Sequence, residues 1–171
     1  MRSELDTALD DVVARLTAPG GMLETVPFER FGRQLPMLKN APPTLPVLFE
    51  TFCAQHGDAT FLVDGDIRLS FAQTFAAARA VAGGLVAGHG VKKGDRIGIA
   101  ARNSTNWIVA YMAVLMAGGC ASLLNGWWSG EEMAAGIELT GCSIVLADKQ
   151  RAARIAELPV DTRVVLFEHD C

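Results

Sequence analysis

The sequence predicts an α/β fold in which N-terminal helices and a small β-hairpin lead into a mostly parallel βαβαβαβ sheet. Two observations support this prediction. From residue 96 onward, short apolar runs alternate with stretches of helical periodicity, which is the order that builds a parallel sheet with helices on its faces. The runs are apolar throughout, as expected of strands that are covered on both sides.

Composition narrows the class of protein. The 171 residues suffice for one domain with a real core, and with half of them apolar and a fifth charged they have an ordinary globular composition. The net charge of −4 argues against a nucleic-acid partner, because a surface that neutralises phosphates needs a basic excess. The N-terminus is acidic and has no apolar segment of signal-peptide length, so the expected location is cytoplasmic.

Residues 1–43 are expected to form a helix followed by an extended arm. In residues 3–17 the apolar residues share one helical stripe, Ser3 can cap the helix, and acidic residues occupy the early turns. The Pro-Gly-Gly sequence at residues 19–21 ends it. Residues 22–43 show no period and contain several prolines, which predicts an extended arm that lies against the body of the protein.

The next segment should be a helix followed by a hairpin. Thr44 can cap the helix, which tolerates a proline in its first turn and ends at Gly57. The dipeptide Asp64-Gly65 accepts the positive φ angles of a tight turn. Short strands are therefore predicted at residues 60–63 and 67–69.

A long alanine-rich helix should follow the hairpin. Ser70 and Gln73 match a capping box, and the helical pattern continues to about Gly88. Gly83-Gly84 interrupts the pattern, and we expect close packing of the helix against a neighbour at this pair.

A βαβ unit is predicted over residues 96–124. Residues 96–101 suit a strand, and Asn103-Ser104 offers helix caps before a run of apolar residues at helical spacing. Gly118-Gly119 ends the helix where a left-handed residue is needed, and residues 120–124 form the second strand. A right-handed crossover then makes the two strands parallel.

Two further helix and strand pairs are predicted beyond this unit. A capping box of Ser129 and Glu132 starts a helix that ends at Gly141, and a strand follows at residues 143–147. A short helix at residues 149–158 precedes the last strand, residues 163–167. No helix follows to cover that strand, so we expect the polypeptide to be cut within a larger fold.

The central passage also has a membrane interpretation. No charged residue occurs between Arg102 and Glu131, so a single span through residues 104–124 is long enough to cross a bilayer. The glycine pair at residues 118–119 weakens that interpretation, and a buried helix and strand explain the same composition. We favour the globular interpretation, with at most a weak association with a membrane surface.

The cysteines and acidic residues do not suggest a metal site. Cys53, Cys120, Cys142 and Cys171 form no C-x-x-C pair. Cys120 and Cys142 lie in apolar runs and are predicted to be buried thiols in a reduced compartment. Asp64 and Asp66 flank the hairpin glycine, where ordinary turn chemistry explains them better than a metal.

Several other residues have both a functional and a structural interpretation. Arg102, Asn103 and Ser104 lie at the carboxyl end of a predicted strand, where open α/β sheets bind ligands, but capping and loop roles are favoured. Trp127-Trp128 could line a ligand tunnel or touch a membrane, and aromatic cover over a helix–sheet joint is favoured. The remaining candidates are interpreted as surface or cap residues: His56, His89, His169, Glu131 and Glu132.

A series of short sequences resembles one enzyme family. They are TLPVLFETFCAQHGDATFLV from Thr44, LSFAQ from Leu69, GVKKGDRIGI from Gly90, ARNSTNW from Ala101, GG-x-A-x-L-L-N ending at Asn125, and a helix with Glu131-Glu132. In this order and spacing, residues 44–167 resemble the N-terminal part of an acyl-CoA synthetase, one of the AMP-dependent synthetases and ligases of the adenylate-forming superfamily. Ser70-Phe71 departs from the threonine-tyrosine pair that the family has there.

The resemblance implies an activity and a division of the chain. Family members join a carboxylic or fatty acid to coenzyme A through an acyl-adenylate, using ATP and magnesium. Residues 1–43 would then be an N-terminal helix and arm, and residues 44–171 a partial synthetase domain truncated before the phosphate-binding loop. Its partners would be the acid, ATP, CoA and the remainder of the ligase chain.

The chain lacks the family's phosphate-binding loop, which is rich in serine, threonine and glycine and ends in proline-lysine. It also lacks a Walker-type G-x-x-x-x-G-K-[ST] motif and a G-x-G-x-x-G motif after residues 96–100. We therefore assign no catalytic, cofactor-binding or metal residue in this chain and expect it to be inactive alone. The alternative hypothesis is a free-standing α/β binding or interaction module without catalysis.

Overall fold

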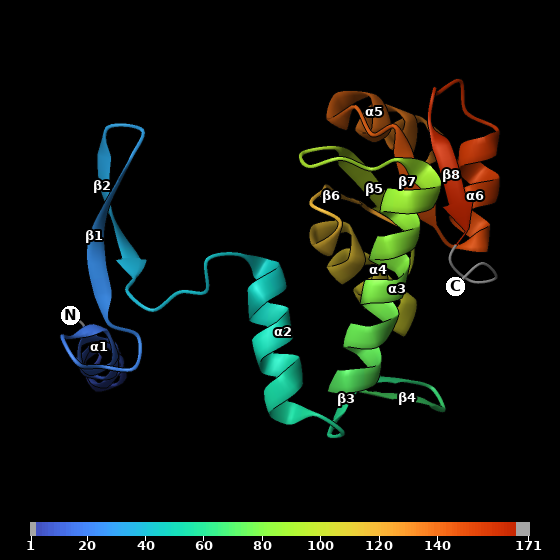
Figure 1. Ribbon diagram of the computed structural model, residues 1–171. Coiled ribbons are helices and arrows are strands. Elements are labelled where there is room, and N and C mark those ends of the chain that lie inside the picture. The colour runs from blue at the N-terminus through green and yellow to red at the C-terminus, as the bar shows by residue number, and fades with distance from the viewer. Residues whose placement is uncertain (1–2, 167–171) are drawn as a thin grey trace. The chain divides into compact units, whose positions relative to one another are not determined.

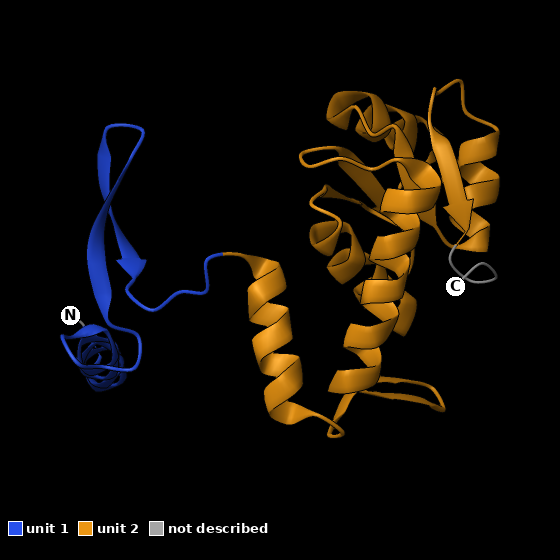
Figure 2. Ribbon diagram, in the orientation of Figure 1, with its two compact units in different colours: residues 1–43 blue, residues 44–171 orange. Residues whose placement is uncertain are grey.

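The computed structural model describes residues 3–166, and the chain divides into two units, residues 1–43 and 44–171 (Figure 2). Unit 1 begins with α1 (Glu4–Thr17), which Ser3 caps as predicted, and Asp6 completes a capping box with it. An antiparallel hairpin of β1 (Thr25–Arg30) and β2 (Arg33–Leu38) follows.

The hairpin of unit 1 corrects the prediction of an extended arm over residues 22–43. Its turn is Phe31-Gly32, in which both residues have positive φ angles of 53° and 71°. A two-residue hairpin turn of this kind usually carries Asn-Gly or Asp-Gly. Pro27 pairs with Pro36 across the hairpin, so the prolines that argued against strands lie opposite each other.

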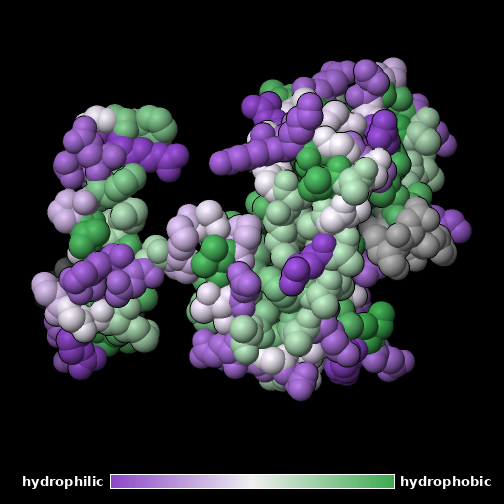
Figure 3. Space-filling view, in the orientation of Figure 1, coloured by the Kyte–Doolittle hydropathy of each residue, from purple (hydrophilic) through white to green (hydrophobic). Residues whose placement is uncertain are grey.

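Unit 1 has little core of its own. None of its described residues is buried. The predicted apolar stripe of α1 is at the surface, with Leu5 exposed to 68% and Leu9 to 55%. Apolar residues accordingly appear at the surface of this unit (Figure 3).

Unit 2 begins with the predicted helix, hairpin and long helix (Figure 1). Thr44 caps α2 (Leu45–His56), and Gly57 ends it. The strands β3 (Thr60–Asp64) and β4 (Ile67–Ser70) pair antiparallel around Gly65. The capping box of Ser70 and Gln73 starts α3 (Phe71–His89), and left-handed Gly90 ends it.

A four-stranded parallel sheet forms the rest of unit 2. Its strands are β5 (Arg96–Ala100), β6 (Cys120–Leu124), β7 (Ile144–Ala147) and β8 (Arg163–Leu166), in the order β6-β5-β7-β8. This confirms the predicted parallel α/β fold. The last residue of the predicted fourth strand, Phe167, lies outside the described residues.

The helices cover the two faces of the sheet. On one face α3 and α4 (Thr105–Met116) pack against Ile97, Ile99 and Leu146. On the other, α5 (Gly130–Thr140) and α6 (Lys149–Ala156) pack against Val145 and neighbouring strand residues. Successive strand residues thus enter opposite cores, as a pleated strand requires.

The predicted close packing at Gly83-Gly84 is wrong. A Cβ atom added to either glycine would meet nothing within 4 Å, because α3 packs through Ala78, Ala82 and Leu85 instead. Close packing occurs at Gly136 of α5, where an added Cβ would lie 2.5 Å from the Trp128 ring.

The uncharged central passage is divided between α4 and β6, with left-handed Gly118 between them. In residues 3–166 we find no helix that combines the length and the apolar character needed to span a membrane.

Candidate functional site

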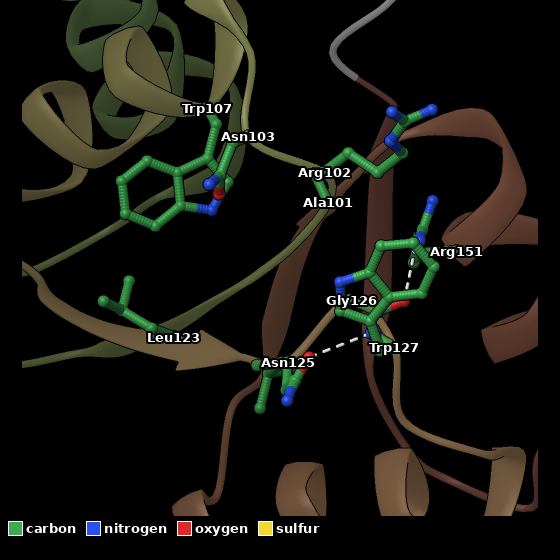
Figure 4. A pocket seen from close by; sticks show the side chains of 10 residues that line it. Ala101, Arg102, Asn103, Trp107, Leu123, Asn125, Gly126, Trp127 and Arg151 are labelled. Carbon is green, nitrogen blue, oxygen red and sulfur yellow. Dashed lines mark hydrogen bonds between the residues drawn. The ribbon is translucent and has the colours of Figure 1, made fainter.

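A cavity of about 400 Å³ opens at the carboxyl edge of the parallel sheet. Its walls come from the end of β6 and from the segments that follow β5 and β6, together with Trp107 of α4 and Arg151 of α6 (Figure 4). Three of the residues singled out in the sequence, Arg102, Asn103 and Trp127, line it.

The topology of the sheet explains why a cavity forms here. The chain leaves β5 toward α4 on one face and leaves β6 toward α5 on the other face. Because neighbouring strands send their following segments in opposite directions, a crevice opens between their carboxyl ends. Crevices of this kind are where open α/β sheets bind ligands.

A buried ion pair holds the edge of this cavity together. Asp148 follows β7 and lies 3.2 Å from the guanidinium of Arg151, and both side chains are more than nine-tenths buried. The carboxylate also accepts hydrogen bonds from the backbone N–H of Arg102 at 3.0 Å and of Arg151 at 2.9 Å. Asp148 thereby caps α6 and binds the segment after β5.

Arg151 extends the network to the segment after β6. Its Nε donates to the carbonyl oxygen of Gly126 at 2.8 Å, the bond drawn beside Trp127 in Figure 4. The pair therefore ties together the carboxyl ends of three strands, β5, β6 and β7. Burying two charges is unfavourable unless both are paired and hydrogen-bonded, and these bonds meet that condition.

Sequence reasoning did not identify Asp148 or Arg151. The available signal was an aspartate directly after an apolar strand, with an arginine three residues later on a short helix. That spacing fits an N-cap and an i,i+3 pair, but it does not reveal that both side chains would be buried.

The structure separates the roles of Arg102, Asn103 and Ser104. Ser104 caps α4, because its Oγ accepts a hydrogen bond from the backbone N–H of Trp107 at 3.2 Å. Arg102 is anchored through its backbone by Asp148, while its side chain and that of Asn103 are at the cavity. The capping prediction is confirmed for Ser104 alone.

The two adjacent tryptophans also differ. Trp128 is partly buried and packs on the core beneath α5 and α6, which confirms the prediction of aromatic cover. Its carbonyl oxygen accepts a hydrogen bond from Arg154. Trp127 is 83% exposed and lines the cavity, and its backbone N–H donates to Asn125 Oδ1 at 2.9 Å.

Four of the remaining candidate residues, Asp64, Glu132, His56 and His89, have structural partners. Asp64 Oδ2 accepts a hydrogen bond from the backbone N–H of Thr105 at the start of α4, and Glu132 completes the capping box of α5. His56 lies 4.8 Å from the Phe71 ring, and His89 lies 3.5 Å from Arg163. His169 is outside the described residues.

The cysteine predictions are partly correct. Cys142 is buried as predicted, whereas Cys120 is exposed, so its prediction is wrong. Cys120 begins β6, which is an edge strand, and an apolar run in the sequence does not distinguish an edge strand from a central one. Cys53 is buried as well, and burial raises the pKa of its thiol. Cys171 lies outside the described residues.

The described part of the chain, residues 3–166, holds no group of three or more His, Cys, Asp or Glu side chains that could bind a metal ion.

In a comparison with known protein families, residues 49–170 match the family described as AMP-binding enzyme. A medium/long-chain-fatty-acid–CoA ligase of Mycobacterium tuberculosis is 30% identical over 118 residues, which cover 69% of this chain and 20% of that protein. The chain thus spans about a fifth of the length of this relative.

Two solved structures are similar in fold. The anthranilate CoA ligase AuaEII in complex with anthranoyl-AMP has a TM-score of 0.69 and 18% identity, covering 75% of this chain and 26% of that one. The O-succinylbenzoate coenzyme A synthetase of Bacillus subtilis in complex with AMP has a TM-score of 0.57 and 27% identity, covering 68% and 30%.

Proposed function

Because the chain belongs to the AMP-binding enzyme family, we propose that it forms part of the N-terminal domain of an ATP-dependent acid–CoA ligase. The family match over residues 49–170, which include every strand of the parallel sheet, is the observation that supports this proposal. The ligase would convert a carboxylic acid, ATP and CoA into acyl-CoA, AMP and diphosphate.

The reaction needs two steps because a carboxylate is a poor acyl donor. In the first, a carboxylate oxygen attacks the α-phosphorus of ATP and the bond to diphosphate breaks, giving an acyl-adenylate. In the second, the thiol of CoA attacks the acyl carbon, AMP leaves, and the thiol proton passes to a base. Both steps need hydrogen-bond donors around phosphate oxygens that carry growing charge.

We propose that residues 44–171 contribute mainly scaffold to this chemistry. The Asp148–Arg151 pair would keep the carboxyl ends of the strands in register around the cavity. Groups that bind ATP, magnesium and CoA would lie on portions of the ligase outside this chain. The chain spans only about a fifth of the mycobacterial relative, which supports this division.

A fatty acid is the proposed substrate class, and the setting would be fatty acid metabolism in the cytoplasm. The name of the mycobacterial relative supports this choice. The similar solved structures carry names of ligases for aromatic acids, so a test must include both kinds of acid.

The test uses the native polypeptide that carries these residues, incubated with ATP, magnesium, CoA and a panel of fatty and aromatic acids. Mass spectrometry should detect acyl-CoA and AMP in equal amounts with at least one fatty acid. AMP without a thioester, or no acid-dependent product from any member of the panel, would contradict the proposal.

A further inference from the structure

Residues 1–43 carry two exposed apolar surfaces and precede the part of the chain that matches the AMP-binding enzyme family, residues 49–170. The first surface is the apolar stripe of α1, whose exposed members are Leu5, Leu9, Val12 and Val13. A helix with such a stripe normally buries it against another surface, because apolar side chains are unfavourable in water. Unit 1 does not supply that surface, since none of its described residues is buried.

The second surface is one face of the hairpin formed by β1 and β2. Side chains alternate between the two faces along a strand, and directly paired residues share a face. The register therefore places four apolar residues on one face: Val26, Phe28, Leu35 and Met37. The pair Arg30 and Arg33, next to the turn, belongs to the same face. Neither arginine forms an ion pair with residues 3–166, so this face is apolar at one end and positively charged at the other.

The two surfaces complement each other in charge. With about 3.6 residues per helical turn, the acidic residues of α1 flank its apolar stripe, Glu4 and Asp11 on one side and Asp6 and Asp10 on the other. The carboxylates beside the stripe thus match the guanidinium groups on the hairpin face. Charge complementarity of this kind selects the partner and sets the orientation in which two surfaces meet.

Hydrogen bonds in the connection hold α1 away from the hairpin face of its own chain. The backbone N–H of Leu23 donates to the carbonyl oxygen of Leu16 at 2.8 Å, which closes the turn after α1. Glu24 accepts from the backbone N–H of Gly20 at 3.1 Å and from Lys39 Nζ at 2.9 Å, which joins this turn to the end of β2. The helix thus lies at the end of the hairpin opposite the hairpin turn (Figure 1). Covering its own hairpin face would break these bonds, so a second copy is the partner that fits.

We propose that unit 1 is a dimerisation surface, in which α1 of each copy of this chain covers the apolar hairpin face of the other copy. Two-fold symmetry makes the exchange reciprocal, so the apolar surfaces of both copies become buried together. The carboxylates of α1 then lie beside the two hairpin arginines of the second copy. This role belongs to residues 1–43 and is separate from the ligase activity proposed for the residues that follow.

The first test is the association state of the native polypeptide that carries these residues, measured by sedimentation velocity over a range of concentrations. A monomer–dimer equilibrium is expected. Leu9→Glu places a charge in the middle of the stripe and, because each dimer contains the substitution twice, should raise the dimer dissociation constant about a hundredfold. The matched control is Leu139→Glu, which alters an exposed leucine on α5 of unit 2 and should leave the constant unchanged.

Charge reversal tests whether the contact is between copies. Asp10→Lys with Asp11→Lys makes the centre of α1 basic without weakening the helix, since lysine is the better helix former. Arg30→Glu with Arg33→Glu makes the hairpin face acidic. Each variant alone should dimerise about tenfold more weakly, because both of its contacts place like charges together. An equimolar mixture of the two variants should recover dimers, because a mixed dimer has one reversed contact and one native contact, and both are attractive.

Three results would overturn the proposal. They are a native polypeptide that stays monomeric at the highest concentration, an equal effect of Leu9→Glu and Leu139→Glu, and no recovery of dimers in the mixture of charge-reversed chains. Recovery by mixing is specific to a contact between copies, because α1 folded back onto its own chain would not respond to a second chain. None of these measurements depends on acid activation, so their failure would leave the proposed ligase function as a separate question.

Discussion

Asp148 accepts three hydrogen bonds although its side chain is almost wholly buried. Arg151 is equally buried and bonds to both Asp148 and the Gly126 carbonyl. At the scale of single residues, this pair is the connection between the ends of β5, β6 and β7. Its loss should therefore affect both stability and the shape of the cavity.

Replacing Asp148 with alanine tests the pair. The substitution leaves Arg151 buried without its counter-ion, which typically costs about 3–5 kcal/mol of unfolding free energy. Urea denaturation followed by circular dichroism measures the loss. Asp66→Ala, an exposed turn aspartate, is the control and should change stability by less than about 0.5 kcal/mol. Equal losses of unfolding free energy in the two variants would show that the Asp148–Arg151 pair contributes no more stability than an exposed aspartate.

Cysteine reactivity is a second test at this scale. Cys120 is exposed, whereas Cys53 and Cys142 are buried, and burial also raises the pKa of the Cys53 thiol, which lowers its thiolate fraction. Brief treatment of the folded chain with a maleimide should modify Cys120 well before Cys53 and Cys142. Peptide mass mapping reads the order, and denatured chain is the control. Modification of Cys142 before Cys120 would contradict the assignment of β6 as an edge strand.

At the scale of elements, the predictions that succeeded depended on local signals. The capping boxes at Ser70 and Ser129 and the left-handed Gly141 bounded helices as predicted, because caps act within one turn of the chain. The hairpin in unit 1 was not predicted, because Phe31 at a positive φ angle gives no recognisable turn signal. The packing at Gly83-Gly84 was misjudged because sequence alone does not show which helix face is covered.

Two glycine-to-alanine substitutions should therefore have opposite effects. At Gly84, alanine meets nothing within 4 Å and should stabilise the exposed face of α3 by up to about 1 kcal/mol through helix propensity. At Gly136, alanine collides with the Trp128 ring and should destabilise by about 1–3 kcal/mol. Thermal melts of both variants measure whether each substitution stabilises or destabilises the protein. A stabilising Gly136→Ala would refute the close packing of α5 against Trp128.

The stability of the unit 1 hairpin should depend on pH through the ionisation of Glu24. Hydrogen bonds from Lys39 Nζ at 2.9 Å and from the backbone N–H of Gly20 hold the pKa of Glu24 below its ordinary value of 4.5. Because the folded pKa is depressed, its contribution to stability is present above pH 4.5 and is lost as the pH falls through the folded pKa. A carboxyl NMR titration should give a lower pKa for Glu24 in the unaltered protein than in the Lys39→Met variant. An identical Glu24 pKa in the unaltered protein and the variant would exclude the contact between Lys39 and Glu24.

At the scale of the whole molecule, the sequence indicated a parallel α/β sheet but not its strand order. Regular alternation of strand and helix after residue 96 predicts parallel strands. It does not show that β7 pairs with β5 and not with β6, the strand before it in sequence. The placement of Arg102 and Asn103 at a strand end was foreseen. The contribution of Arg151 to the same cavity was not, because it depends on a contact across more than twenty residues of sequence. A cavity role for Trp127 was considered in the sequence but was not favoured over aromatic cover.

We propose that these residues serve as scaffold for acid adenylation while other portions of the ligase bind ATP. Acid-dependent exchange of labelled diphosphate into ATP measures the adenylation step directly, in the native polypeptide and in the 171-residue chain side by side. We expect exchange by the native polypeptide and none by the 171 residues alone. Exchange by the isolated 171-residue chain, or none by the native polypeptide with any acid, would contradict it.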